Sequence, residues 1–352
     1  MFAVLAWSFE RTLVAQVDEQ FHADLVVSSP HFAEGWISAP LGGELVDTVA
    51  GLPEVAVSAG FQAVSTEVNG ESAFLFSFDP SAFLDERILG LPLERGALAD
   101  ARTQVAAGQG VFVSTALARE RGLSVGDRVA LGPGPGTDSI PIVGVTRAEA
   151  NPAVIMSRSR YRAIFSDAHI REVHVAVRPD THPAAAAEAI RRATGERFRL
   201  QVRDGADFRR FFADQARSAF DGLYLMEGVT FLLVLIGIGD SLAVGVLERL
   251  RHFGTMRAIG LRRLDLSKIV ALESLAIGVI GLTTAGAMGG ALSLYWVKIE
   301  FPLLVRWDLD LHLPGSVIVT AVTATLVIAI IAAILPALRL TMLPLSMALR
   351  ND

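Results

Sequence analysis

The sequence predicts an α+β domain outside a membrane, followed by an all-α bundle of three membrane-spanning helices. The 352 residues are 52% hydrophobic and have a mean hydropathy of +0.46, which is high for a soluble domain of ordinary composition. Three long apolar runs occupy the last third of the chain. The stretch from about Asp24 to Ala213 instead places short apolar runs between Gly and Pro residues, a pattern typical of a folded domain.

The first residues predict an amphipathic helix from about Ala6 to about His22. Apolar side chains recur there at every fourth position from Leu13 to Phe21. Met1 to Trp7 is apolar but too short to cross a bilayer, and no Lys or Arg precedes it as in a signal peptide. We therefore expect residues 1–23 to be the outer end of a longer helical segment.

The outer domain is predicted over residues 24–213 and begins with a hairpin. Two strand-like runs, Val55–Val68 and Glu71–Phe78, flank Asn69-Gly70, a dipeptide that tolerates the positive φ angles of a tight primed turn. A small inserted module is expected over residues 99–167, with elements in the order strand, helix, strand and strand at Val111–Ser114, Ala116–Arg121, Arg128–Leu131 and Ile140–Val145.

The outer domain is predicted to end in a strand, a helix, a strand and a second helix, at Glu172–Val177, Pro183–Thr194, Arg197–Val202 and Asp204–Ser218. The last helix carries Phe208 and Phe212 on one side and continues into the first apolar run. We expect it to form a stalk that leads into the membrane.

Residues 214–352 predict the membrane domain. Runs at about 223–247, 269–297 and 316–335 each reach the roughly 20 apolar residues that cross a ~30 Å hydrocarbon core. The loop between the first two runs is rich in basic residues, namely Arg249, Arg251, Arg257, Arg262, Arg263 and Lys268. Cytoplasmic loops carry such an excess, so this loop is expected in the cytoplasm of a bacterium, with the large domain outside the plasma membrane.

Catalytic and cofactor motifs are missing from the sequence. Its seven histidines are scattered without a metal-binding spacing, and cysteine is absent. Gly132 to Gly136 is glycine-rich but lacks the Lys-Ser/Thr of a phosphate-binding loop, so it predicts a surface turn. We expect no enzyme, no cofactor or metal in this chain and no nucleic-acid partner, and any ATP and Mg²⁺ to be bound by another chain.

Polar and small residues in the apolar runs suggest contacts within a helix bundle. Asp240 lies inside the first run, where it would form a structural hydrogen bond or serve a proton relay or substrate contact. Small residues lie four apart at Gly237, Ser241 and Gly245, and at Gly286 and Gly290. This spacing favours close helix packing, although glycine is also simply common in membrane helices.

The basic loop contains an amphipathic stretch from Glu248 to Gly260. Leu250, Phe253 and Met256 mark one face, basic residues occupy the others, and Gly260 is placed to end the helix. Such a helix at the cytoplasmic surface would dock on a partner protein or bind anionic lipid, and periodicity favours neither.

This stretch resembles the FtsX-like permease domain. Glu248-Arg249 and Arg257-Ala258-Ile259-Gly260 match the family's E-R and R-A-apolar-G pattern, and Leu335 to Arg339 with Pro344 to Arg350 is similar to its tail. In the outer domain, Val113 to Ala118 with Gly122 to Asp127 and Pro141 to Val145 resembles the MacB-like extracytoplasmic core domain. The resemblance covers nearly the whole chain.

The resemblance implies a permease subunit that works with a cytoplasmic ABC-type ATPase and a second permease subunit, as a homodimer or a heterodimer. The stretch would be the coupling helix that contacts the ATPase, with the expected contact residues Glu248, Arg249, Arg251, Phe253, Met256, Arg257 and Gly260. The family has four spans, so the first helix is missing or truncated here. ATP hydrolysis by the partner would change the shape of the outer domain and drive export or extraction of a substrate.

Two alternatives stay open at this point. The chain could be a transmembrane regulator whose outer domain activates an extracytoplasmic cell-wall hydrolase without moving cargo. It could also be a lone lipid-anchored sensor that needs no ATPase. Co-purification of an ATPase would argue against the sensor. A gene for an efflux-type partner beside the ATPase gene would favour the permease, and a gene for a peptidoglycan hydrolase would favour the regulator.

Overall fold

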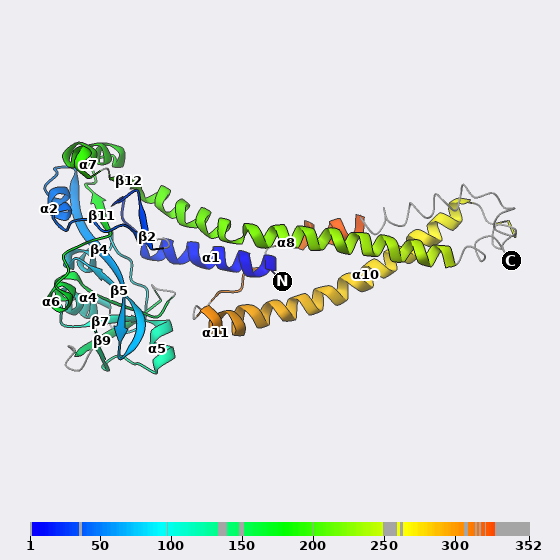
Figure 1. Ribbon diagram of the computed structural model, residues 1–352, viewed down its shortest axis with the longest axis horizontal. Coiled ribbons are helices and arrows are strands. Elements are labelled where there is room, and N and C mark those ends of the chain that lie inside the picture. Colours follow the sequence, from blue (N-terminus) through cyan, green and yellow to red (C-terminus); the bar gives the residue numbers. More distant parts are fainter. Residues whose placement is uncertain are drawn as a thin grey trace. The chain divides into compact units, whose positions relative to one another are not determined.

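The computed structural model describes residues 2–34, 37–96, 98–132, 139–147, 151–198, 200–248, 259–260, 263–305, 309–313, 315–316, 318–320 and 322–327. Two compact units are present (Figure 1). A helical unit takes its described residues from 1–8, 217–299 and 311–352, and an outer unit takes its residues from 9–216 and 300–310.

The outer unit is built on one mixed sheet. Its strands and those of a small hairpin are β1 (Leu25–Ser28), β2 (Phe32–Glu34), β3 (Ile37–Ser38), β4 (Val55–Val68), β5 (Glu71–Phe78), β6 (Leu93–Arg95), β7 (Val111–Ser114), β8 (Arg128–Ala130), β9 (Ser139–Thr146), β10 (Ala153–Ser157), β11 (Glu172–Val177) and β12 (Gln201–Asp204). The order is β12-β1-β11-β4-β5-β10-β7-β9-β6, with β8 on β9, while β2 pairs with β3. Only β10 with β5 and β7 with β9 run parallel among these pairs. The predicted α+β class of the outer domain is therefore confirmed.

Helices cover both faces of this sheet. They are α1 (Phe2–Gln20), α2 (Glu44–Ala50), α3 (Pro80–Leu84), α4 (Leu98–Ala106), α5 (Thr115–Arg121), α6 (Arg158–Phe165), α7 (Pro183–Phe198) and the start of α8 (Gly205–Glu248). On one face, α2 and α7 bury a cluster around Val175, while α5 and α6 bury a cluster around Leu75. On the other face, α3 and α4 pack on a cluster around Phe112. Successive side chains of a strand point to opposite faces of the sheet, so Val26 of β1 lies on the face that α3 and α4 cover. The end of α1 and the start of α8 pack on Val26, which places them on the same face.

The predicted hairpin is confirmed in register and turn. Strands β4 and β5 pair antiparallel from Phe61↔Phe78 to Val68↔Glu71. Asn69 and Gly70 have φ angles of +51° and +85°, as a primed two-residue turn requires at both central positions.

The residues that carry the outer-domain resemblance have structural roles. The Ser114 hydroxyl accepts a hydrogen bond from the Leu117 amide and so caps α5, which ends at Gly122 with φ +63°. Gly126, with φ +98°, donates its amide to the Ile142 carbonyl. The strands of the predicted module over 99–167 belong to the same sheet as β4 and β5.

One strand prediction was wrong at its start. Residues 197–202 were expected as a strand, but α7 continues to Phe198 and β12 begins only at Gln201. Packing of Ala186 and Ile190 against the sheet stabilises α7. Adding residues to an existing helix is easier than starting one, so the helix continues through the first residues of the predicted strand. The predicted strand at Glu172–Val177 and hairpin strand at Glu71–Phe78 match β11 and β5 residue by residue.

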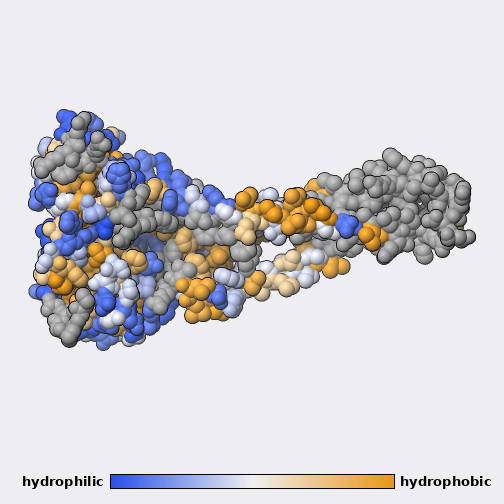
Figure 2. All heavy atoms as spheres, in the orientation of Figure 1, coloured by the Kyte–Doolittle hydropathy of each residue, from blue (hydrophilic) through white to orange (hydrophobic). Residues whose placement is uncertain are grey.

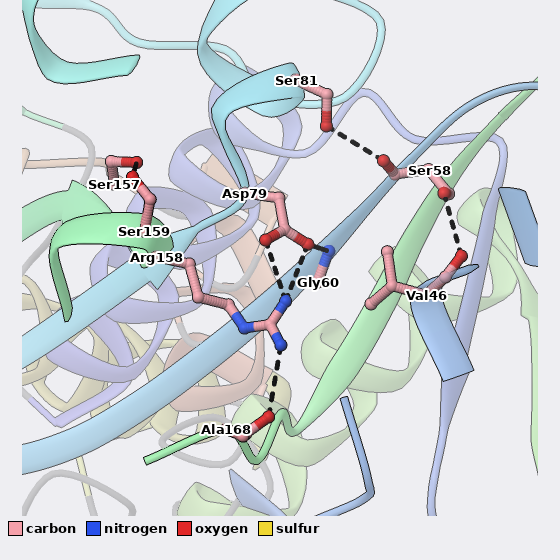
Figure 3. A network of polar contacts seen from close by, with 9 residues as sticks. All are labelled: Val46, Ser58, Gly60, Asp79, Ser81, Ser157, Arg158, Ser159 and Ala168. Atoms are coloured by element: carbon pink, nitrogen blue, oxygen red, sulfur yellow. Dashed lines mark hydrogen bonds and ion pairs between the residues drawn. The ribbon is translucent and has the colours of Figure 1, made fainter. Parts of the chain in front are cut away.

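A buried polar network ties the helices to the sheet in the outer unit (Figure 3). Arg158, at the start of α6, contacts both carboxylate oxygens of Asp79 and donates to the Ala168 carbonyl. Asp79 also accepts the Gly60 amide of β4 at 2.7 Å. Burial lowers the pKa of Arg158, and the facing Asp79 carboxylate opposes that shift.

The helical unit contains most of α8, together with α10 (Arg263–Tyr295) and the π-helical turn η1 (Trp296–Glu300). Hydrophobic residues gather along the described parts of α8 and α10 (Figure 2). α8 has 44 residues, about 66 Å of helix at 1.5 Å per residue, and covers the predicted stalk and first run without a break.

The predicted bundle of three membrane helices is not confirmed. By length and apolar composition, one stretch within the described residues qualifies as a candidate span, Gly278–Leu304. It extends past the predicted end at Val297, because η1 and α11 (Phe301–Val305) continue the helical backbone beyond that residue. The first run is helical, and its assignment as a membrane span stays a prediction. The third shows a short apolar helix, Ile318–Val327, and residues 328–335 lie outside the described part.

Candidate functional site: the stalk junction

Two long helices meet the outer sheet at neighbouring strand ends. α1 ends at Gln20 shortly before β1, and α8 begins at Gly205 directly after β12. β1 and β12 are antiparallel neighbours, with Leu25 opposite Asp204. The end of α1 and the start of α8 therefore lie together, and we call their contact region with the sheet the stalk junction (residues 17–24, 86–90, 174 and 205–209).

Apolar packing forms the centre of the stalk junction. The rings of Phe21 and Phe208 are 4.5 Å apart between centroids, and both side chains are buried with Ala23 and Val26. An ion pair joins Asp18 and Arg209 at 3.1 Å beside these rings. It is partly exposed, so its contribution to stability is small, and the two rings make the main connection.

Two glycines allow the close approach. The Gly90 amide donates to the Gln20 carbonyl at 2.9 Å, and the Gly205 amide donates to the Asp24 carbonyl at 2.8 Å. A Cβ at Gly90 would clash with the Glu19 carbonyl oxygen, and one at Gly205 would clash with the Ala23 carbonyl oxygen. Any side chain at these positions would push the stalk helices away from the domain.

A buried arginine holds the loop that receives α1. Arg102 of α4 donates to the carbonyls of Phe83 at 2.8 Å and Leu89 at 2.5 Å, and it pairs with Glu86 at 3.0 Å. The Glu86 carbonyl lies 2.7 Å from Nδ1 of His22, just beyond α1. Burial lowers the pKa of Arg102, with Glu86 opposing the shift. The loop is thus fixed on one side to α4 and on the other to α1.

His174 lies directly beneath the stalk junction in β11. Its ring centroid is 5.0 Å from that of Phe21, and its Nε2 is 3.1 Å from the Glu172 carboxylate. Glu172 accepts a further hydrogen bond from the Ser38 hydroxyl at 3.2 Å. Nδ1 of His174 is buried and has no hydrogen-bond partner among the described atoms.

The segment after η1 also contacts α1 within the outer unit. The Phe9 and Phe301 rings are edge to face at 6.1 Å, and the Asp310 amide donates to the Thr12 hydroxyl at 3.1 Å. Leu309 beside them is 2% exposed. α1 therefore packs on residues of the segment 301–310 as well as on α8.

Most predicted coupling residues lie outside the described part, namely Arg249, Arg251, Phe253, Met256 and Arg257. Glu248 is the last residue of α8. Gly260 lies in a turn with φ +106°, the left-handed conformation expected of a glycine that reverses the chain. The coupling role of all seven residues stays a prediction.

The predicted intramembrane and packing residues lie on α8 and α10. Asp240 is exposed on α8. Gly237, Gly286 and Gly290 are also exposed, and no described atom lies within 4 Å of a Cβ built on them. Ser241 and Gly245 lie on α8, so the packing prediction for the set stays a prediction.

The stalk junction consists of ring packing, backbone hydrogen bonds and one partly exposed ion pair between the helices. No group of three or more His, Asp or Glu that could hold a metal occurs among the described residues. Sequence reasoning placed Phe21 and Phe208 on helix faces but missed Gly90, Gly205, Arg102 and His174. A short-range signal could not have found them, because their partners are distant in sequence.

Comparison with known proteins agrees with this architecture. The MacB-like periplasmic core domain matches residues 1–193, which is more than half of the chain, and the FtsX-like permease C-terminal domain matches residues 225–345. The chain belongs to the MacB-like family of ABC transporter permeases. In this MacB-like permease, the stalk junction is built by the end of α1 and the start of α8 on the core-domain sheet.

Curated relatives and solved structures are similar to different shares of this chain. The chain is 26% identical to the macrolide export ATP-binding/permease protein MacB of Agrobacterium fabrum over 88% of this chain and 46% of that protein. It is 22% identical to an uncharacterized ABC transporter permease protein of Mycobacterium tuberculosis over 98% of this chain and 41% of that protein. The MacB-like permease chain thus spans less than half of the length of these relatives. The periplasmic region of MacB from Actinobacillus actinomycetemcomitans superposes with a TM-score of 0.42 at 12% identity, covering 57% of this chain and 97% of that one.

Proposed function

We propose that this chain is the permease subunit of an ABC-type transporter, in which ATP hydrolysis by a partner ATPase changes the shape of the outer domain and drives export or extraction of a substrate. The observation that carries the proposal is α8. It begins at the stalk junction with Gly205 and runs unbroken to Glu248, where the stretch that resembles the family's coupling helix begins. A continuous helix transmits a push along its axis because backbone hydrogen bonds join each of its turns to the next.

The relatives support export and a separate source of ATPase activity. Two of them are named as macrolide export ATP-binding/permease proteins, which favours export over the activation of a cell-wall hydrolase. This chain matches less than half of their length, and its sequence lacks a phosphate-binding loop. We therefore assign ATP and Mg²⁺ binding to a partner ATPase or to a fused ATPase domain.

We propose a multi-pass plasma-membrane protein with the basic loop in the cytoplasm and the core domain outside. The excess of Arg and Lys between the first and second runs supports this orientation. A reporter that is active only in the cytoplasm, fused at Gly260, should be active, and one fused at Gly70 in the β4–β5 turn should be inactive. The reverse result would reject the orientation and the ATPase contact with it.

A second permease subunit is proposed to pack against the small residues of the helices. The open space beside Gly237, Gly286 and Gly290 leaves room for the backbone of a neighbouring helix. Cysteines placed at Gly286 in this cysteine-free chain should cross-link two copies in a homodimer, whereas a heterodimer would give no cross-link between copies.

The experiment that tests the function is co-purification of an ATPase with the membrane-embedded chain. Phe253→Asp places a charge on the apolar face of the proposed coupling helix and should reduce the co-purified ATP hydrolysis at least about tenfold, as loss of a central interface anchor does. Leu84→Asp is the matched control, because Leu84 is an exposed leucine (65%) of the outer unit. Equal ATP hydrolysis with both variants would reject the coupling assignment.

A further inference from the structure

A row of aromatic rings starts at the stalk junction and enters the outer sheet. Phe208 of α8 lies 4.5 Å from Phe21, and Phe21 lies 5.0 Å from His174 of β11. His174 in turn lies 5.6 Å from Phe61 of β4, all measured between ring centroids. These spacings are those of interacting aromatic pairs, so each ring contacts the next.

The row continues to the next strand. Phe61 lies 5.9 Å from Phe76 of β5, with an angle of 18° between the ring planes, and Phe76 lies 6.0 Å from Phe74 at 7°. The sheet order is β11-β4-β5, so the row crosses neighbouring strands in spatial order. Its members come from α8, from Phe21 directly after α1, and from β11, β4 and β5.

Ordinary core packing does not explain this arrangement fully. Phe61, Phe74 and Phe76 are only half-buried. Phe61 and Phe76 pack against the cluster that α3 and α4 cover, and the row continues beyond that cluster to Phe74. At its centre stands His174, a polar residue that is 5% exposed. An apolar ring would fill this place without leaving a buried Nδ1 unpartnered.

A polar tether fixes the orientation of the central ring. Nε2 of His174 contacts the Glu172 carboxylate, which is itself held by Ser38 of β3. Phe21 and Phe78 meet the imidazole edge to face at 73° and 64°, while Phe61 is tilted at 31°. The imidazole is therefore held between Phe21, on the stalk side, and Phe61, on the sheet side.

We infer that this row, with His174 as its positioning residue, carries displacement of the start of α8 across β11 into β4 and β5. The inference rests on the proposed function and names the route by which the outer domain would respond. Closely packed rings have low compressibility, so displacement of the first ring displaces the next. A cavity in the row would let neighbouring side chains change position instead, and the displacement would not reach the next ring. The test measures the coupling between the two ends of the row directly.

The experiment perturbs one end of the row and reads the other in the full chain, reconstituted in lipid nanodiscs. Gly205→Ala displaces the start of α8 from the Ala23 carbonyl. Amide hydrogen exchange of β5, residues 71–78, should then accelerate at least about threefold, since local opening becomes easier. In a His174→Ala background the same Gly205→Ala change should accelerate β5 exchange by less than about one and a half times.

Two further backgrounds separate coupling from general loosening. Phe112→Leu removes a fully buried ring that contacts Phe83 outside the row, and the threefold response of β5 should persist there. His174→Phe keeps a ring at the centre, loses the tether to Glu172, and should retain at least about half of the response. An equal response in the His174→Ala and wild-type backgrounds, or no response in the wild type, would overturn the inference. The co-purification of an ATPase is measured separately, so loss of the proposed function and loss of this route give different results.

Discussion

Nη1 of Arg158 lies 2.8 Å from Oδ1 of Asp79, in a pair that is almost fully enclosed by the outer unit. The Arg158 side chain is 2% exposed and that of Asp79 is 20% exposed. Asp79 is the N-cap residue of α3, but its carboxylate makes no cap hydrogen bond and is directed to Arg158 and Gly60 instead. The pair thus joins α3, α6 and β4.

Removing the carboxylate from this pair should strongly destabilise the outer unit. Asp79→Ala leaves a buried guanidinium without its counter-ion, which costs about 3–5 kcal/mol in the free energy of unfolding. Asp85→Ala is the matched control: Asp85 is 22% exposed, much like Asp79, but its partner Arg87 is 50% exposed and is not left buried without a counter-ion, so this pair contributes about 0–1 kcal/mol. Urea titration of the full chain in nanodiscs, read by pulse proteolysis of the outer unit, gives both values. Similar losses for the two variants would show that Arg158 is stabilised without Asp79.

Stability in acid should depend on Asp167. Burial alone raises the pKa of Asp167, but hydrogen bonds from Tyr161, His169 and Gln62 outweigh it and hold the pKa well below its usual range. The folded pKa is therefore below the unfolded value of about 3.9, so the stabilisation is present above about pH 4 and is lost as the pH falls further.

The Asp167→Asn variant provides the measurement. Its free energy of unfolding should be lower than that of the wild type at pH 6, and the gap should narrow between about pH 4 and pH 2.5 as the wild type loses the benefit. Urea titrations at each pH follow the gap. If the difference in free energy of unfolding stayed constant over this pH range, the substitution would destabilise through altered packing and hydrogen bonding rather than through loss of the charge.

Two buried serines precede short helices and should differ in importance. Ser114 accepts the Leu117 and Ala153 amides at 3.1 and 3.0 Å and donates to the Asn151 carbonyl at 2.9 Å. Ser157, before α6, makes no cap hydrogen bond and contacts the Ser159 hydroxyl. Ser114→Ala should cost about 1–2 kcal/mol, and Ser157→Ala less than half of that, by thermal unfolding in nanodiscs. Equal losses in the free energy of unfolding for the two variants would mean that the hydrogen bonds of Ser114, including the cap of α5, add no stability beyond that of an uncapped serine.

Local patterns predicted the elements that local interactions decide. Asn69-Gly70 identified the β4–β5 hairpin because the turn geometry follows from two adjacent residues. The spacing of Val17 and Phe21 placed them on one face of the predicted helix, and both lie in the cluster at the stalk junction, although α1 ends at Gln20, one residue before Phe21. The helix over the start of α8 was predicted for the same reason.

The stalk junction as a whole could not be predicted. Gly90 is required by a carbonyl of α1, and Arg102 holds a loop whose contact with α1 exists only after the sheet has formed. His174 is one of seven histidines in the sequence, and only the register of β11 beside β4 sets it among phenyl rings. The apolar run predicts an end at Val297, whereas the helical backbone continues through η1 and α11 to Val305.

Gly90→Ala should separate α1 from the outer domain. The new methyl group would clash with the Glu19 carbonyl, a backbone atom at the end of α1 that cannot turn aside as a flexible side chain would. We expect a loss of more than about 1 kcal/mol in the free energy of unfolding, because the native backbone leaves no room for Cβ. Gly51→Ala is the matched control: its Cβ would meet only ordinary contacts at 3.6 and 3.7 Å, and its φ is −74°, so it should be neutral or stabilise by about 0.4–1 kcal/mol. Hydrogen exchange of residues 17–24 should accelerate in Gly90→Ala and stay unchanged in Gly51→Ala. If Gly90→Ala accelerated exchange only in the loop at 86–90 and left α1 protected, the loop would yield to α1, and Gly90 would not be what holds the stalk to the sheet.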